Sequence, residues 1–221
     1  MISFKQFLHE GVNDPAIFKA VFLAGGPGSG KSFVVGKTAL TSFGFKVVNS
    51  DDAFEISMRK AGMTMDPDDI FSDKGQQLRG KAKALTGRKQ EAYIKGRLGL
   101  VIDGTGKDYG KIKQQRDMLE KLGYETAMIF VNTDKETALA RNRARNRSLP
   151  DNEVVKMWNS VQGNIGKFQG VFGSNLHIVD NSQDADITQG TLRAYREIQK
   201  WVKMPPRNGL AQRWIKKELS K

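Results

Sequence analysis

The chain has 221 residues and a formal net charge of +12, and it contains no cysteine. This length fits one domain, or one domain with short appendages. The missing cysteines exclude disulfide bonds, catalytic thiols and thiolate metal sites. The sequence also lacks the run of about 18 apolar residues that indicates a membrane-spanning helix, and its start lacks the pattern of a signal peptide. We therefore expect a cytoplasmic protein with no membrane partner.

Positive charge is concentrated at the C-terminal end of the chain. In residues 193–221 only Glu197 and Glu218 oppose a long series of lysines and arginines. A surface this basic favours a polyanionic partner such as nucleic acid. The alternative is a basic surface exposed to water. The sequence leaves open whether this end binds nucleic acid or packs on the rest of the chain.

The apolar pattern divides the chain into an appended segment at 1–18, a main domain at 19–203 and a basic tail at 204–221. In the appended segment Phe4, Phe7 and Leu8 share one helical face, which indicates a helix packed on the core or, alternatively, an arm for a partner. Strands are predicted at 20–24, 44–52, 98–103, 124–131 and 176–180. Helices are predicted at 32–40, 53–61, 76–97, 108–122, 134–145, 151–168, 184–202 and 210–219. The acidic stretch 62–75 is predicted to be a solvated loop.

Strands alternate with helices along the whole main domain. This order predicts an α/β fold with a parallel sheet of about five strands and helices on both faces, of the P-loop NTPase or kinase type. Ligands of such sheets bind at the carboxyl ends of the strands. The functional residues are therefore expected directly after the predicted strands.

A P-loop pattern follows the first predicted strand, with Gly25, Gly30, Lys31 and Ser32 at the required spacing. Glycines let the backbone N–H groups surround a phosphate, Lys31 reaches the β- and γ-phosphates, and the Ser32 hydroxyl can bind Mg²⁺. We therefore expect ATP and Mg²⁺ as cofactors. The residues predicted to bind the nucleotide are Gly25, Gly26, Pro27, Gly28, Ser29, Gly30, Lys31, Ser32 and Phe33.

Two aspartates, Asp51 and Asp52, follow the second predicted strand. Phosphoryl transfer to an alcohol is helped by a carboxylate that orients and deprotonates the attacking hydroxyl. Adjacent side chains point in different directions, so we assign this role to Asp51 and place Asp52 near the substrate. The alternative role for such an aspartate is capping of the following helix.

Asp103 ends the third predicted strand. A carboxylate in this position is the Walker-B arrangement, which holds Mg²⁺. Asp103 and Thr105 are also candidates for binding the acceptor, since Gly104 between them permits a close approach.

Arginines alternate along the predicted helix 134–145, where Arg141 and Arg145 share one face and Arg143 and Arg147 share another. Arginines stabilise the charge on a phosphoryl group in transfer. Arg141 and Arg145 are therefore predicted to be catalytic, together with Lys31 and Asp51. The alternative is a solvated basic helix end, which suits the helix dipole.

Five separated blocks between about residues 20 and 180 resemble P-loop kinases of the zeta-toxin and polynucleotide-kinase group. These blocks are Gly25–Ser32, Asn49–Asp52, Asp103–Thr105, Leu119–Glu125 and the pair Arg141 and Arg145. The resemblance implies that Asp51 is the catalytic aspartate of the polynucleotide kinases. It also implies that Asp103–Thr105 is similar to the substrate-contacting Glu-Gly-Thr of zeta toxins, with Asp in place of Glu, and that Arg141 and Arg145 match the helix-and-lid arginines. Phe54 stands where the polynucleotide kinases carry a substrate-reading arginine.

The sequence thus predicts a kinase that transfers the γ-phosphate of ATP to a hydroxyl of a nucleic acid or nucleotide-like acceptor. One alternative is a zeta-toxin-like kinase of a UDP-sugar, and another is a nucleic-acid-binding ATPase with no acceptor except water.

Overall fold

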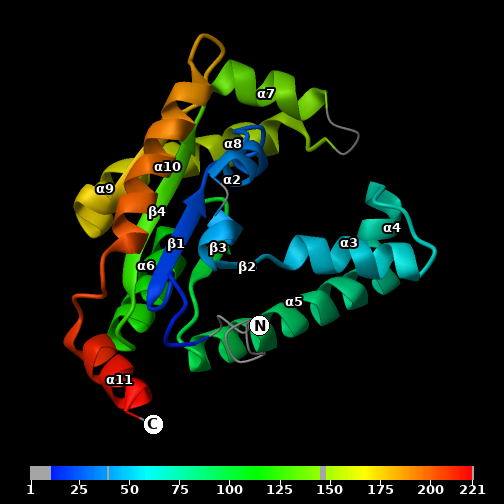
Figure 1. Cartoon of the computed structure of the whole chain (residues 1–221). Coiled ribbons are helices and arrows are strands. Elements are labelled where there is room, and N and C mark those ends of the chain that lie inside the picture. Colours follow the sequence, from blue (N-terminus) through cyan, green and yellow to red (C-terminus); the bar gives the residue numbers. More distant parts are fainter. Residues whose placement is uncertain (1–10, 39, 145–147, 221) are drawn as a thin grey trace, which may run out of the picture.

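The computed structural model describes residues 11–38, 40–144 and 148–220. At its centre lies a five-stranded sheet in the order β2-β3-β1-β4-β5, in which all neighbouring strands are parallel (Figure 1). The strands are β1 (Lys19–Ala24), β2 (Lys46–Val48), β3 (Leu100–Asp103), β4 (Glu125–Asn132) and β5 (Leu176–Asp180). The predicted fold class and number of strands are therefore confirmed.

Helices pack on both faces of the sheet, as the alternation predicts. The helices are α2 (Lys31–Thr38), α3 (Ser50–Lys60), α4 (Pro67–Phe71), α5 (Asp73–Lys95), α6 (Tyr109–Lys121), α7 (Lys135–Arg143), α8 (Asp151–Gln162), α9 (Ile165–Phe172), α10 (Ile187–Lys203) and α11 (Gly209–Leu219). On one face, Val34 of α2 and Ile198 of α10 pack with Val21 of β1. On the other face, Leu119 of α6 and Phe168 of α9 pack with Phe22 of β1. Each apolar side chain of β1 is thus buried, which explains its unbroken apolar run.

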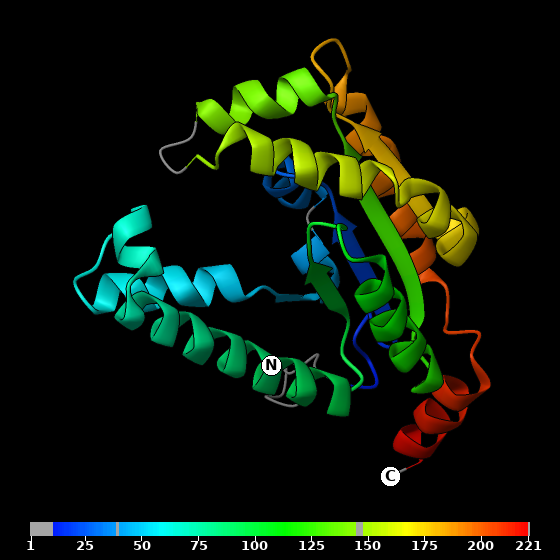
Figure 2. The same ribbon diagram turned by 180° about the vertical axis from the view of Figure 1, so that it is seen from behind.

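Helices α3, α4 and α5 form an arm that projects from the sheet, on the side where α7 and α8 lie above it (Figures 1 and 2). The arm has its own small core of Phe54, Met58, Ile70 and Ala82. Phe54 is buried there, and the Arg79 guanidinium lies 4.7 Å from the centre of its ring. Phe54 therefore has a packing role at the position where the polynucleotide kinases carry an arginine.

Several predicted boundaries were wrong. Strand β2 ends at Val48, and Asn49 caps α3, so Asp51 and Asp52 lie in the first turn of a helix rather than at a strand end. The acidic loop predicted at 62–75 contains α4, which has Pro67 in its first turn, and the start of α5, where the Ser72 hydroxyl accepts from the Gly75 amide.

The long helix predicted at 151–168 is two helices, α8 and α9, separated at Gly163 and Asn164. The Asn164 side chain donates to the carbonyls of Gly106 and Lys107, both at 3.0 Å. These contacts hold the chain against the loop after β3 at the point where the two helices separate. Helix α7 ends at Arg143, two residues before the predicted end. The predicted helical face of Phe4, Phe7 and Leu8 lies outside the described residues. None of the described helices is both long and apolar enough to cross a membrane.

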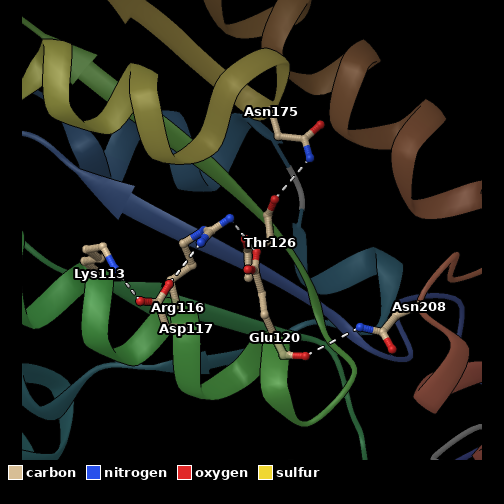
Figure 3. Close-up of polar contacts among 7 residues, drawn as sticks. All are labelled: Lys113, Arg116, Asp117, Glu120, Thr126, Asn175 and Asn208. Atoms are coloured by element: carbon tan, nitrogen blue, oxygen red, sulfur yellow. Dashed lines mark hydrogen bonds and ion pairs between the residues drawn. The ribbon is translucent and has the colours of Figure 1, made fainter.

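Polar contacts tie α6 to β4 and to the C-terminal tail, at the end of the sheet away from the P-loop (Figure 3). The Glu120 carboxylate accepts from the Thr126 hydroxyl at 2.8 Å and pairs with Arg116 at 2.9 Å. Asn175 donates to the Thr126 carbonyl at 3.2 Å, and Asn208, the cap of α11, donates to the Glu120 carbonyl at 3.5 Å. This network holds the start of α11 against the main domain.

Helix α11 also packs on the main core. Ala211 is fully buried in the same cluster as β1, and the Trp214 ring lies edge-on to Phe18, with 5.5 Å between the ring centres. The basic side chains Arg213, Lys216 and Lys217 stay exposed. The tail therefore packs through one face and presents its charge on the other.

Replacing Trp214 with alanine is expected to destabilise the whole domain by about 2 kcal/mol, less than for a fully buried tryptophan. The measurement is urea unfolding followed by circular dichroism, with Leu219→Ala as the control on the same helix, because Leu219 is exposed. If the main transition kept its midpoint while α11 melted separately, the tail would be an independent unit, as the predicted division at residue 204 suggests.

Candidate active site

The P-loop connects the carboxyl end of β1 to α2. Gly28 and Gly30 have positive φ angles of 73° and 86°, a conformation that favours glycine. Larger residues would also collide with the surroundings, because a Cβ on Gly28 would lie 2.6 Å from the Ala138 carbonyl oxygen and one on Gly30 would lie 2.3 Å from the Asn181 amide nitrogen. These glycines therefore let α7 and the segment after β5 approach the loop closely.

The loop after β3 lies directly beside the P-loop. The Gly25 amide donates to the Thr105 carbonyl at 3.0 Å, and the Gly104 amide donates to the Leu23 carbonyl at 3.1 Å. Lys31 is the first residue of α2, and its ammonium donates to the Gly25 carbonyl at 2.6 Å. The predicted nucleotide-binding residues and the Asp103–Thr105 block are thus held at one edge of the sheet.

Asn49 links the two aspartates that the sequence assigns to catalysis and to the metal. Its amide nitrogen donates to Asp103 Oδ2 at 3.1 Å, while its amide oxygen accepts from the Asp51 backbone amide at 2.8 Å. The first contact orients the Asp103 carboxylate. The second caps α3 and so places Asp51 in the first turn of that helix. Asn49 therefore performs the capping that the sequence offered as an alternative role for an aspartate.

Burial raises the pKa of Asp103 above its usual value. The neighbouring Lys31 ammonium opposes this shift, while the charges of Asp51 and Asp52 add to it. The second oxygen, Oδ1, is buried and has no hydrogen-bond partner among the described residues. A buried carboxylate oxygen without a hydrogen-bond partner has lost its contact with water at a cost in free energy. A bound cation would compensate for that loss.

A cavity of about 550 Å³ begins at Lys31, Asp51 and Asp103 and extends between the arm and α6. Its floor is apolar and comes from the sheet and α6, with Phe22, Val48, Ile102 and Ile112. Its rim is polar, with Thr86 and Gln90 from α5 and Gln115 from α6, and it carries Lys83, Lys107 and Lys111. Thr105 also lines the cavity, whereas Asp52 does not. Its volume matches that of small-molecule sites.

The arginines of α7 divide between two surroundings. Arg141 lies at the P-loop, where its guanidinium donates to the Gly28 carbonyl at 3.4 Å and to Asn181. Arg143 is exposed and forms an ion pair with Asp151 of α8. Arg145 lies outside the described residues. Arg141 therefore lies beside the P-loop and Arg143 faces solvent, while the catalytic role predicted for Arg141 and Arg145 stays a prediction.

Ser32 and Asp103 fit the Mg²⁺ that the P-loop implies. The Ser32 hydroxyl is exposed at the start of α2, and the Asp103 oxygen without a partner supplies a hard anionic ligand. In the described part of the chain no three His, Cys, Asp or Glu side chains gather as a metal site. Mg²⁺ at nucleotide sites generally binds through few protein groups plus phosphate oxygens.

The sequence model of a family described as "AAA domain" matches residues 21–162, which include the P-loop, Asp51, Asp103 and Arg141. The chain belongs to this AAA domain family. The matched residues run from β1 to the end of α8, so the AAA domain contains the cavity and most of its surroundings.

Solved structures share the fold of this AAA domain at low sequence identity. The crystal structure of AvrRxo1-ORF1 with AvrRxo1-ORF2 and sulphate ions has a TM-score of 0.60 at 16% identity, covering 82% of this chain and 63% of that one. The PezAT toxin-antitoxin system of Streptococcus pneumoniae has a TM-score of 0.52 at 13% identity, covering 83% and 86%. The Pnkp1/Rnl/Hen1 RNA repair complex has a TM-score of 0.51 at 21% identity, covering 68% and 46%. These likenesses show the P-loop kinase type of fold.

Among curated proteins, the large ribosomal subunit protein uL4 of Fervidobacterium nodosum is 27% identical over 116 residues. This stretch covers 52% of the chain, and the chain spans about half of that protein, 48% of its length. The AAA domain match therefore remains the finding that identifies the family.

Two groups of residues at the candidate site were missed by the sequence reasoning. The first is Asn181, which directly follows β5 and contacts the P-loop. The rule that functional residues follow strand ends would have found it, had it been applied to the fifth strand as to the second and third. The second is the lysines on the rim of the cavity. They come from α5, from the loop after β3 and from α6, and only the packing of the arm beside α6 brings Lys83 to Lys107 and Lys111.

Proposed function

We propose that this protein is an ATP- and Mg²⁺-dependent kinase that transfers the γ-phosphate to a hydroxyl of an anionic, nucleotide-like acceptor. The observation that carries this proposal is the cavity in which Lys31, Asp51 and Asp103 meet and which continues into a pocket with a lysine rim. A phosphate-binding loop serves many activities, whereas a carboxylate beside the phosphate and a separate pocket next to it suit transfer to a second substrate.

Each residue has a defined task in this proposal. The P-loop amides and Lys31 bind the β- and γ-phosphates. Asp51 accepts the proton of the attacking hydroxyl and orients it toward the phosphorus. Ser32 and Asp103 hold Mg²⁺, which when bound neutralises charge on the phosphates. Arg141 and Arg145 stabilise the charge of the transferring group, and Thr105 and Asp52 contribute to acceptor binding.

The lysine rim supports an anionic acceptor better than the basic tail does. Helix α11 packs on Phe18 and close to Gly123, which precede β1 and β4, so it lies at the opposite end of the sheet from the P-loop (Figure 1). Charge on the tail is therefore remote from the reacting phosphate. Lys83, Lys107 and Lys111, in contrast, line the cavity beside Asp51 and suit a phosphate on the acceptor.

The experiment is a screen with γ-labelled ATP and Mg²⁺. The acceptors are a 5′-hydroxyl oligonucleotide, a nucleoside 3′-monophosphate, a UDP-sugar and an uncharged nucleoside. We expect label on at least one phosphate-bearing acceptor and little on the uncharged nucleoside. Label on the UDP-sugar alone would favour the sugar-nucleotide kinase. Label found only in inorganic phosphate, with release stimulated by nucleic acid, would favour the ATPase and contradict the kinase.

Replacing Lys83 or Lys111 with methionine is expected to raise the KM for the phosphate-bearing acceptor about tenfold or more, because a charge-assisted contact is lost. The KM for ATP should stay unchanged. Lys81→Met on α5 and Lys121→Met on α6 are the matched controls, since both lysines are exposed and neither lines the cavity. Equal effects in controls and test variants would show that general charge, not the rim, attracts the acceptor.

A further inference from the structure

We propose that Asn181 is a positioning residue that sets the shape of the P-loop and links it to Arg141. Asn181 follows β5 directly and is 6% exposed. It is far from the P-loop in sequence, yet its side chain lies against the loop. The inference rests on the proposed function only for its kinetic readout, because nucleotide binding tests it separately.

Both polar atoms of the Asn181 side chain form hydrogen bonds, one with the P-loop and one with Arg141 of α7. Its amide nitrogen donates to the Ser29 carbonyl at 2.7 Å, within the P-loop. Its amide oxygen accepts from Arg141 Nη2 at 3.2 Å. One side chain therefore joins the phosphate-binding loop to the arginine of α7, and each contact needs a different end of the amide.

The backbone of Asn181 is itself fixed, so the side chain has a firm base. Its amide donates to the Asn132 carbonyl at 2.9 Å, at the end of β4. Its carbonyl accepts from Arg141 Nη1 at 3.0 Å and from the Thr133 hydroxyl at 3.1 Å. Because Asn132 and Thr133 lie at the end of β4, next to the end of β5, the sheet sets the position of Asn181.

Gly30 shows how closely Asn181 fits the loop. A Cβ at Gly30 would lie only 2.3 Å from the Asn181 amide nitrogen, so the loop backbone passes directly over this side chain. The Ser29 carbonyl, held by Asn181, must point away from the bound phosphate if the following amides are to point toward it. Arg141, in turn, donates to the Gly28 carbonyl at 3.4 Å. Asn181 and Arg141 thus donate to two successive carbonyls of the loop.

Two variants of Asn181 separate the contacts. Asn181→Asp keeps the oxygen for Arg141 but places a second oxygen against the Ser29 carbonyl, whereas Asn181→Ala removes both contacts. Both are expected to raise the Kd for Mg-ATP at least tenfold, measured by titration calorimetry. In the kinase assay, both should raise the KM for ATP more than the KM for the acceptor.

Thr133→Val is the matched control, because it removes one buried hydrogen bond to Asn181 without touching the P-loop. Thermal unfolding should show a similar loss of stability in Thr133→Val and Asn181→Ala, but Thr133→Val should bind Mg-ATP within twofold of the wild type. If the Asn181→Asp variant does not fold, the Kd of the Asn181→Ala variant for Mg-ATP alone tests the proposal.

Binding of Mg-ATP within twofold of the wild type by folded Asn181→Ala, or an equal loss of affinity in Thr133→Val, would overturn the proposal and leave Asn181 as a structural residue. Failure of the kinase is a different outcome. If the wild type binds Mg-ATP but labels no acceptor, the proposed function fails, and the Kd values still decide the role of Asn181.

Discussion

Replacement of Asp51 with asparagine is expected to lower kcat for phosphoryl transfer by about 10²- to 10⁴-fold, the usual contribution of a general base. Asparagine has the size of aspartate but cannot accept the proton of the attacking hydroxyl. The P-loop and Lys31 are not altered, so the Kd for Mg-ATP should remain within about twofold of the wild-type value. Single-turnover labelling of the acceptor measures the first quantity, and calorimetry measures the second.

The matched control for Asp51 is Glu55→Gln. Glu55 lies one turn further along α3, is exposed and does not line the cavity. The Glu55→Gln substitution removes the same charge from the same helix as Asp51→Asn does. The comparison therefore separates a specific role of Asp51 from a general electrostatic effect. A folded Asp51→Asn variant that kept most of its turnover would disprove the assignment of the base, while leaving the nucleotide site intact.

Replacement of Glu125 with glutamine is expected to destabilise the protein by about 3 kcal/mol, because it leaves a buried ammonium without its counter-charge. Lys19 is fully buried at the start of β1, and its Nζ pairs with Glu125 at 2.5 Å. The same ammonium lies 4.8 Å from the centre of the Trp201 ring. Denaturant unfolding measures the change. Lys113→Met, which removes an exposed pair with Asp117, should leave the midpoint unchanged.

The defect of Glu125→Gln should shrink as the pH rises. Burial lowers the pKa of Lys19 below its usual value of 10.5, and the Glu125 carboxylate opposes that shift. Without the carboxylate the folded-state pKa falls further. Between this pKa and 10.5 the unfolded chain binds the proton that the folded chain lacks, so stability increases with pH in that window. Unfolding curves between about pH 7 and pH 10 should therefore converge with those of the wild type. A constant difference across this range would mean that Lys19 stays charged.

The fold was predictable because its signals are local. The apolar runs of β1, β3 and β4 and the glycine spacing of the P-loop are visible in the sequence, and one rule about parallel sheets brings Asp51 and Asp103 to the same edge. The helix boundaries were less predictable. Asn49 caps α3 through a local contact with the Asp51 amide, whereas Asn164, between α8 and α9, is held by contacts with Gly106 and Lys107 that only the tertiary structure supplies.

Contacts between distant segments could not be predicted. Lys19 directly precedes an apolar run, but no nearby residue in the sequence indicates that Glu125 is its partner. The contact of Asn181 with Ser29 spans 152 positions. Lys83 belongs to a helix whose basic residues look like a solvated face, and only the packing of α5 beside the cavity distinguishes it from Lys81. The roles of Arg141 in charge stabilisation and of Asp52 in acceptor binding stay predictions.

The separate core of the arm has a consequence for how acceptor choice can change. Phe54, Met58, Ile70 and Ala82 form a core that joins α3, α4 and α5, while Tyr93 and Ile94 at the end of α5 pack on a main core of the sheet. For the proposed kinase, substitutions on the arm side of the cavity are expected to change which acceptor binds while the P-loop keeps its nucleotide. Under the same proposal, exchange of residues 50–95 between related chains, with Tyr93 and Ile94 kept, is a direct way to engineer new acceptors onto an unchanged phosphate donor site.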